Sequence, residues 1–174
     1  MYRFSSSLPF LLARLGVRMG ELFARELARD GLTLPMYRVL AALSDEGVPQ
    51  RLGELAQRVS AELSTLSRLA MEMERRGLVT RSRPESDQRS LAVALAPRGR
   101  ALAERLRPRA AHYEQVATGD LKTREAAALK ATLVRVYENL DRLEREIEAA
   151  EAATPQPGPR RPRLVAGGGR SGSG

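Results

Sequence analysis

Hydroxyl and guanidinium side chains gather in two nearby polar segments of this chain. The first segment contributes Ser64, Thr65, Ser67 and Arg68, and the second contributes Arg81, Arg83 and Arg89. Serine and threonine hydroxyls donate and accept hydrogen bonds, and arginine pairs with phosphates and with guanine edges. Small hydroxyl side chains also let a helix approach another surface closely. We therefore expect these residues to contact double-stranded DNA; an ordinary solvated helix face is the alternative.

Two short helical patterns place the first segment. Apolar residues recur three and four positions apart in each pattern: Leu52, Leu55, Ala56 and Val59, then Leu63, Leu66, Leu69, Ala70 and Met73. Ser60 suits the N-cap of the second helix, where its hydroxyl would accept a backbone N–H, and Gly77 suits its C-terminal end. Two helices joined by so short a break are typical of a helix-turn-helix. Residues 64–68 then lie on the exposed face of its second helix.

Beyond Gly77 the apolar residues alternate with a period of two. Leu78 and Val79 begin one expected strand, and Leu91, Val93 and Leu95 mark its partner. The polar loop between the strands, residues 81–89, holds the second group of arginines. A helix-turn-helix followed by a basic hairpin is a winged helix. We predict a mainly α fold with a small β-hairpin and a DNA-binding core at residues 33–96.

Three motifs give this region a specific resemblance: Arg75-Arg76-Gly77-Leu78-Val79, Asp87-Gln88-Arg89-Ser90 and Leu95-Ala96-Pro97-Arg98-Gly99. In this order and spacing they resemble the MarR family of bacterial transcription regulators, over roughly residues 8–150. Ala96 stands where the family has a threonine. The resemblance implies a winged helix-turn-helix with N- and C-terminal dimerisation helices, and a homodimer that represses at a pseudo-palindromic operator. It also implies that Arg89, on the wing, enters the minor groove of DNA.

Long helical patterns flank the winged region. We expect a first helix at about residues 7–30, a second after Thr33 with Pro35 in its first turn, and a fifth that begins at Pro97. Pro108 should kink or break that fifth helix. The last helix has an unbroken apolar seam: Leu129, Leu133, Val136, Leu140, Leu143 and Ile147. A seam this long favours pairing with a second copy of the chain, and packing within one protomer is the alternative.

The length of 174 residues indicates one domain, which we place at residues 1–153. The remaining residues, 154–174, are rich in proline, glycine and arginine. We expect this tail to be disordered, because it can bury too little apolar surface to offset its ordering entropy.

Composition argues against several other functions. The chain has no cysteine, so disulfides, thiolate metal sites and thiol-based sensing are excluded. With His112 as the only histidine and no phosphate-binding glycine loop, we predict no enzyme, no cofactor and no metal site. The formal charge of +8 supports DNA binding modestly. No membrane span or signal peptide is apparent, so we expect a cytoplasmic protein.

The resemblance further implies a small effector, such as an aromatic acid or a phenol, in a cleft between the dimer helices and the winged region. Arg14 and Arg18 are candidates for its anionic group and Tyr37 for its ring, with His112 or Tyr113 opposite. Each of these residues could equally be a surface or core residue. A DNA-binding regulator without an effector, and a helical module that binds another protein, are the alternative functions.

Overall fold

The computed structural model describes residues 3–83 and 90–153. The chain divides into two compact units, one that ends at Gly119 and one that begins at Asp120. The expected single domain over residues 1–153 therefore stays a prediction. Each unit is described by itself below.

The first unit contains five α-helices in its described residues: α1 (Leu8–Ala28), α2 (Leu34–Glu46), α3 (Leu52–Arg58), α4 (Leu63–Arg75) and α5 (Pro97–Ala117), after a short 3-10 turn at Phe4–Ser6. Its strands are β1 (Gln50–Arg51), β2 (Val79–Ser82) and β3 (Ala92–Leu95). They form an antiparallel sheet in the order β1-β3-β2, with both Gln50 and Arg81 paired with Val93. The predicted mainly α fold and the β2–β3 hairpin are confirmed. Strand β1 is an addition that the sequence did not predict.

Local signals set the ends of α2 as expected. The hydroxyl of Thr33 accepts a hydrogen bond from the backbone N–H of Met36 at 3.4 Å, which caps the first turn. Gly47 ends the helix with a φ of +69°, in the left-handed region that costs glycine least. Gly31 has a φ of +65° and turns the chain between α1 and α2. These ends fix where the winged region begins.

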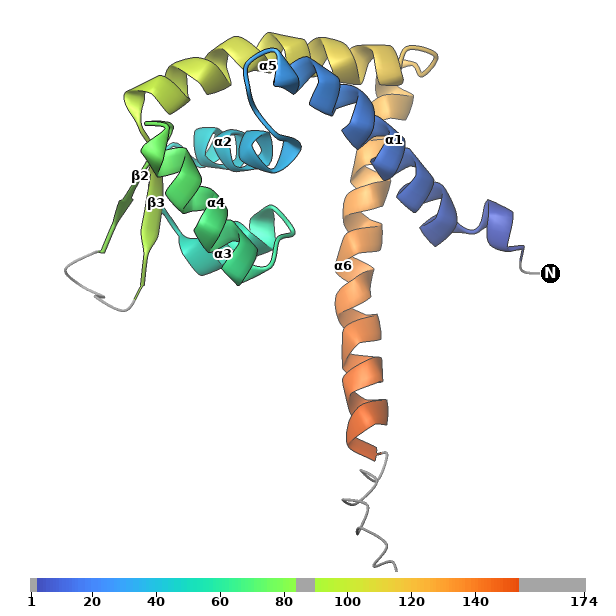
Figure 1. Cartoon of the computed structure of the whole chain (residues 1–174). Coiled ribbons are helices and arrows are strands. Elements are labelled where there is room, and N and C mark those ends of the chain that lie inside the picture. Colours follow the sequence, from blue (N-terminus) through green and yellow to red (C-terminus); the bar gives the residue numbers. More distant parts are fainter. Residues whose placement is uncertain (1–2, 84–89, 154–174) are drawn as a thin grey trace, which may run out of the picture. The chain divides into compact units, whose positions relative to one another are not determined.

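The hydrophobic core of the first unit lies where all of these elements meet. Its fully buried large side chains come from every helix of the unit and from the hairpin: Leu27, Met36, Leu40, Leu43, Leu55, Leu66, Met73, Leu78, Leu106, Val39, Val79 and Val93. Figure 1 shows α3 and α4 next to each other, with the β2–β3 hairpin at one end and α5 passing over α2. Helix α2 packs against α1, α3, α4 and α5, and so forms the centre of the unit.

Helix α5 continues through Pro108 from Pro97 to Ala117, so the helix has no break there, and the alternative of a kink stays a prediction. Proline removes one backbone N–H and crowds the preceding turn. Packing on both sides of Pro108 keeps the helix in place: Leu106 is fully buried, and Arg105 and Arg109 both pair with Asp30. A turn at residues 118–120 follows the end of the helix.

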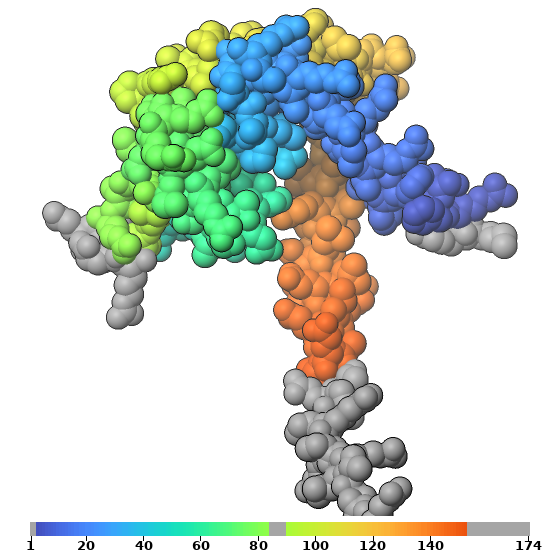
Figure 2. All heavy atoms as spheres, in the orientation of Figure 1, coloured from blue at the N-terminus to red at the C-terminus, as the bar shows by residue number. Residues whose placement is uncertain are grey.

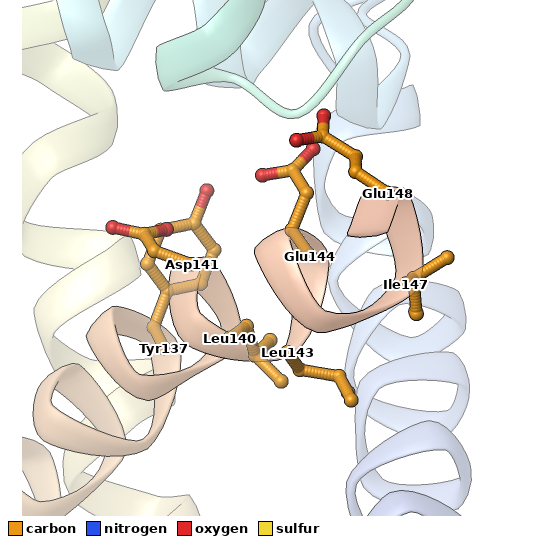
Figure 3. A pocket seen from close by; sticks show the side chains of 7 residues that line it. All are labelled: Tyr137, Leu140, Asp141, Leu143, Glu144, Ile147 and Glu148. Atoms are coloured by element: carbon orange, nitrogen blue, oxygen red, sulfur yellow. The ribbon is translucent and has the colours of Figure 1, made fainter. Parts of the chain in front are cut away.

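The second unit consists, in its described part, of the helix α6 (Thr123–Ala153). Leu133 and Val136 of its apolar seam are half-buried, and Leu129, Leu140, Leu143 and Ile147 are exposed. A shallow groove of about 530 Å³ runs along the helix between Tyr137 and Glu148. Figure 3 shows Leu140, Leu143 and Ile147 on one side of the helix and the carboxylates of Asp141, Glu144 and Glu148 on another. Among the described residues, no helix is long and apolar enough to span a membrane.

Candidate nucleic-acid interface

Helix α4 presents a polar face at the surface of the first unit. Leu66, Ala70 and Met73 are completely buried and fix one side of the helix against the core. On the other side Ser64, Thr65 and Arg68 are exposed, and Ser67 is half-buried. Figure 2 shows the α3–α4 region, in green, at the molecular surface. The hydroxyls and the guanidinium that the sequence singled out therefore lie together on one accessible helix.

The turn before α4 differs from the prediction at Ser60. Its φ is +53°, in the left-handed region, and its backbone N–H donates to Gln57 O at 3.1 Å while Ala61 N–H donates to Ala56 O at 2.9 Å. Both bonds belong to a motif that ends α3. Ser60 therefore belongs to the capping motif that follows α3, and the N-cap of α4 is Glu62, which makes no side-chain cap hydrogen bond. The prediction that Ser60 caps α4 is wrong.

Leu63, which the sequence places in the apolar stripe of α4, is 53% exposed. It occupies the first turn of the helix, and Leu66 is the first residue of α4 that is buried in the core. The buried stripe is thus shorter than the sequence suggested, and the N-terminal turn of α4 projects from the core.

Two of the three predicted wing arginines, Arg81 and Arg83, are among the described residues of the hairpin region. Arg81 lies in β2, and Glu74 of α4 binds it at two points: Oε1 accepts from the Arg81 backbone N–H at 3.1 Å and Oε2 accepts from Nε at 2.8 Å. Arg83 follows β2 and is exposed. Arg89 lies outside the described residues, as do the other residues of the wing tip, 84–89. Sequence reasoning missed Glu74, because nothing in its spacing indicates a contact with a strand.

A second set of contacts holds the C-terminal end of α4. Arg76 donates to the carbonyl of Gly31 at 2.8 Å and approaches Met36 Sδ at 3.1 Å, while Arg98 donates to the carbonyl of Arg76 at 3.2 Å. Gly77 has the expected positive φ, +68°. The end of α4 is thereby tied to the α1–α2 turn and to the start of α5. These contacts hold helix α4 in place, so the orientation of its exposed face relative to the core is fixed.

The candidate effector residues divide into two groups. Phe23 packs edge-on against Tyr37 and in a tilted arrangement against Tyr113, with ring centroids 4.9 Å and 5.0 Å apart, so it joins these two predicted residues. The hydroxyl of Tyr113 donates to Met19 O at 2.6 Å. Burial, and to a lesser degree the charge of Asp45, raises the pKa of Tyr37. Phe23 was missed because a buried phenylalanine in a helix normally indicates only core.

The other three candidates lie at the surface. Arg14 is exposed and its guanidinium stands 5.5 Å from the centroid of the Phe10 ring. Arg18 and His112 are exposed as well. The structure thus brings Tyr37 and Tyr113 together through Phe23, and it places Arg14, Arg18 and His112 outside these ring contacts.

Tyr37 also borders a groove that continues toward α4. A first hollow of about 460 Å³ is lined by Tyr37, Arg38, Ala41, Ala42, Asp45, Arg58, Val59 and Ser60. A second, of about 310 Å³, is lined by Pro35, Arg38, Val59, Ser60, Ala61, Glu62, Thr65, Leu66 and Leu69. The two hollows share Arg38, Val59 and Ser60. A small planar anion could meet the Arg38 guanidinium there, beside a tyrosine ring and apolar walls.

The described residues contain no cluster of side chains that could hold a metal ion. No three histidine or carboxylate side chains converge there as a metal site would require. The arrangement of α4 and the wing is suited instead to hydrogen bonding and charge pairing with a large polyanion.

Comparison with known proteins agrees with this geometry. The model of the MarR family matches residues 32–91, which run from just before α2 to the residue before β3. The transcriptional activatory protein BadR of Rhodopseudomonas palustris is 30% identical over 133 residues, which cover 75% of this chain and 76% of BadR. The transcriptional repressor Mb2911 of Mycobacterium bovis is 35% identical over 99 residues, which cover 56% of this chain and 70% of that repressor.

One solved structure has a similar fold over most of the length of both chains. BpsR of Bordetella bronchiseptica superposes with a TM-score of 0.70 and 28% sequence identity, over 79% of this chain and 97% of that chain. The DNA binding of BpsR is regulated by 6-hydroxynicotinic acid. Sequence and structure comparisons thus point to the same group of proteins.

Proposed function

The chain belongs to the MarR family of DNA-binding transcription regulators, and we propose that it is a homodimeric repressor of a pseudo-palindromic operator. Members of this family are transcription regulators, and in this proposal the protein acts without enzyme activity on the chromosome in the cytoplasm. The proposal extends to an effector, a small aromatic acid or a related compound, that releases the protein from its operator.

The exposed face of α4 is the observation that supports this proposal most. Ser64, Thr65 and Arg68 face outward from a helix that is packed on its other side, with Ser67 at the edge of that face. A helix of this kind fits the major groove, where side chains hydrogen-bond to base edges. Arg83 and Arg89 would supply wing contacts, Arg89 in the adjacent minor groove. There the negative potential of a narrow groove attracts arginine.

Residues 1–153 form one winged domain with dimerisation helices in this proposal, with the DNA-binding core at residues 33–96. The apolar seam of α6 supports the homodimer, because Leu140, Leu143 and Ile147 are exposed in the single chain. Two copies place two α4 helices on two half-sites of DNA, whose centres lie about one helical turn apart in such dimers. The tail at 154–174 lies outside the described residues.

The effector part of the proposal draws on two features of the first unit. The Tyr37–Phe23–Tyr113 aromatic cluster and the groove beside Arg38 offer a ring surface and a positive charge near α4. An effector loosens DNA binding only by its difference in affinity for the two conformations, typically about 1–3 kcal/mol of coupling. The regulation of BpsR by 6-hydroxynicotinic acid makes that compound a rational first probe.

The test begins with the intergenic DNA upstream of the chain's own gene. A gel shift and a footprint on this DNA should show a protected pseudo-palindrome, and sedimentation of the complex should show two protomers for each operator. Binding no tighter than to a random duplex of equal length contradicts the DNA-binding part of the proposal.

Effector screening follows on the same operator. 6-Hydroxynicotinic acid, salicylate and benzoate are added in turn, and operator affinity and melting temperature are recorded. At least one aromatic carboxylate should weaken the complex. A panel that changes neither quantity favours a regulator controlled by its abundance alone.

A further inference from the structure

The two-point contact between Glu74 and Arg81 links helix α4 to strand β2 of the wing. One carboxylate oxygen binds the backbone N–H of Arg81 at 3.1 Å and the other binds its Nε at 2.8 Å. The side chains of Arg81 and Glu74 are 23% and 38% exposed, so the pair is partly shielded from water. Both ends of the carboxylate are used, and the contact therefore fixes an orientation as well as a distance.

The backbone half of this contact has a clear structural reason. β2 is an edge strand, since the sheet order is β1-β3-β2. An edge strand has backbone N–H groups that no neighbouring strand accepts. Arg81 lies opposite Val93 of β3 in the register of the sheet. Its backbone N–H belongs to this set and donates to Glu74 of α4. Glu74 thus takes the place of a neighbouring strand and attaches the edge of the wing to α4.

The hydrogen bond between the Arg81 side chain and Glu74 bears on the role of Arg81. Sequence analysis assigns Arg81 to DNA contact together with Arg83 and Arg89. In the structure its Nε is bound to the carboxylate of Glu74, so this N–H donor is not open to a phosphate and the guanidinium is held toward α4. We propose that Glu74 is a positioning residue, which holds Arg81 and strand β2 at a fixed angle to α4. This inference rests on the proposed function, because it assumes that α4 and the wing bind one DNA site together.

Fixed geometry matters here because the two contacts are made in neighbouring grooves. A wing that swings relative to α4 loses this freedom when it binds its phosphates and groove, which costs conformational entropy. Pre-organising the angle lowers that cost for the operator. Non-specific binding depends mainly on total charge, and it gains little from the angle.

The Glu74→Gln variant separates the two roles by the sign of its effect. A glutamine amide has one acceptor oxygen, so it can replace only one of the two hydrogen bonds that Glu74 accepts from Arg81. The substitution also removes one negative charge near the DNA. If Glu74 positions the wing, affinity for the footprinted operator duplex should fall roughly fivefold, while affinity for a random duplex stays equal or rises. If Arg81 instead contacts DNA, freeing it should tighten operator binding. Unchanged or tighter operator binding by this variant overturns the proposal.

Glu72→Gln is the matched control, because it removes the same charge from the same helix. Glu72 lies 3.9 Å from Arg76 within α4 and makes no described contact with β2. It should leave operator affinity equal or slightly higher. A loss equal to that of Glu74→Gln would show that a general disturbance of α4, and not the link to β2, is responsible. Melting temperatures of both variants verify that each is folded.

Arg81→Met gives an independent readout through salt. A lost phosphate contact lowers the slope of log affinity against log salt by roughly 0.9. A positioning role predicts weaker operator binding with the wild-type slope, and a double variant with Glu74→Gln should be no worse than either single variant. A reduced slope or additive losses would contradict the proposal. Failure of the wild-type protein to bind the operator is a different result, and it contradicts the proposed function itself.

Discussion

The backbone carbonyl of Leu78 lies where a side chain on Gly99 would have to be. A Cβ built on Gly99 would stand 1.9 Å from Leu78 O and 2.8 Å from its carbonyl carbon. Leu78 precedes β2, and its carbonyl also accepts the backbone N–H of Ala96 at 3.1 Å. The first turn of α5 is thus pressed against the chain that leads into the wing. This close approach explains the glycine of the Leu95–Gly99 motif, which sequence analysis used only as a family mark.

Gly99→Ala should destabilise the first unit. The overlap is with backbone, which cannot rotate away as a side chain does, so α5 or β2 must shift. We expect a loss of about 3 kcal/mol, at the upper end for overpacked cores, and a lower melting temperature by calorimetry. Gly53→Ala is the control, since nothing lies within 4 Å of a Cβ there. That change in α3 should be neutral or stabilising, by up to about 1 kcal/mol. Equal stability of the two variants would contradict the close approach.

Asp30 should make stability depend on pH. Hydrogen bonds from Arg109 and Arg105 lower the pKa of Asp30 below its ordinary value of 3.8, and its side chain is only 13% exposed. A carboxylate with a depressed pKa stabilises the fold at pH values above its unfolded pKa, and this contribution is lost as pH falls through the folded pKa. Asp30→Asn should therefore cost roughly 1 kcal/mol at pH 7 and progressively less below about pH 4. Melting curves from pH 3 to 7 measure the difference. Asp120→Asn, in the exposed turn before α6, should show no such trend.

Leu133→Arg combined with Leu140→Arg should dissociate the proposed homodimer. Both positions lie on the apolar seam of α6, and Leu140 is exposed in the single chain. Two arginines would be buried without partners in a paired seam, at a cost of several kcal/mol. Analytical ultracentrifugation measures the result. Glu138→Arg, on the same helix but off the seam, should leave the dimer intact. A double variant that still sediments as a folded dimer would exclude this seam as the interface.

Arg68→Ala and Arg89→Ala should weaken DNA binding in different ways. If Arg68 pairs with a guanine edge, its loss should cost about 1–3 kcal/mol and relax the preference at one position in each half-site. Arg89 is expected in the minor groove, where arginine responds to groove shape. Its loss should weaken operator binding strongly and preserve the preferences in the major groove. Titrations against operators with single-base changes distinguish the two patterns. Unchanged affinity of Arg89→Ala would contradict the wing assignment.

Local patterns in the sequence were sufficient to predict the architecture. The apolar spacing of α3 and α4, the cap at Thr33 and the positive φ of Gly31, Gly47 and Gly77 are all properties of a few neighbouring residues. Backbone sterics and side-chain periodicity act over one or two helical turns, so they can be recognised without knowing the fold. The polar face at 64–68 follows from the same periodicity.

Contacts between distant segments were decided only by the tertiary structure. Strand β1 has two residues and exists because Val93 and Ala92 supply a neighbour. Ser60 takes a left-handed conformation because α3 and α4 must both pack on α2, which an N-cap signal cannot reveal. Phe23 joins Tyr37 to Tyr113 across three helices, and Glu74 of α4 binds Arg81 of β2. Each depends on the distance between groups far apart in the chain, and that distance is fixed when the core is packed.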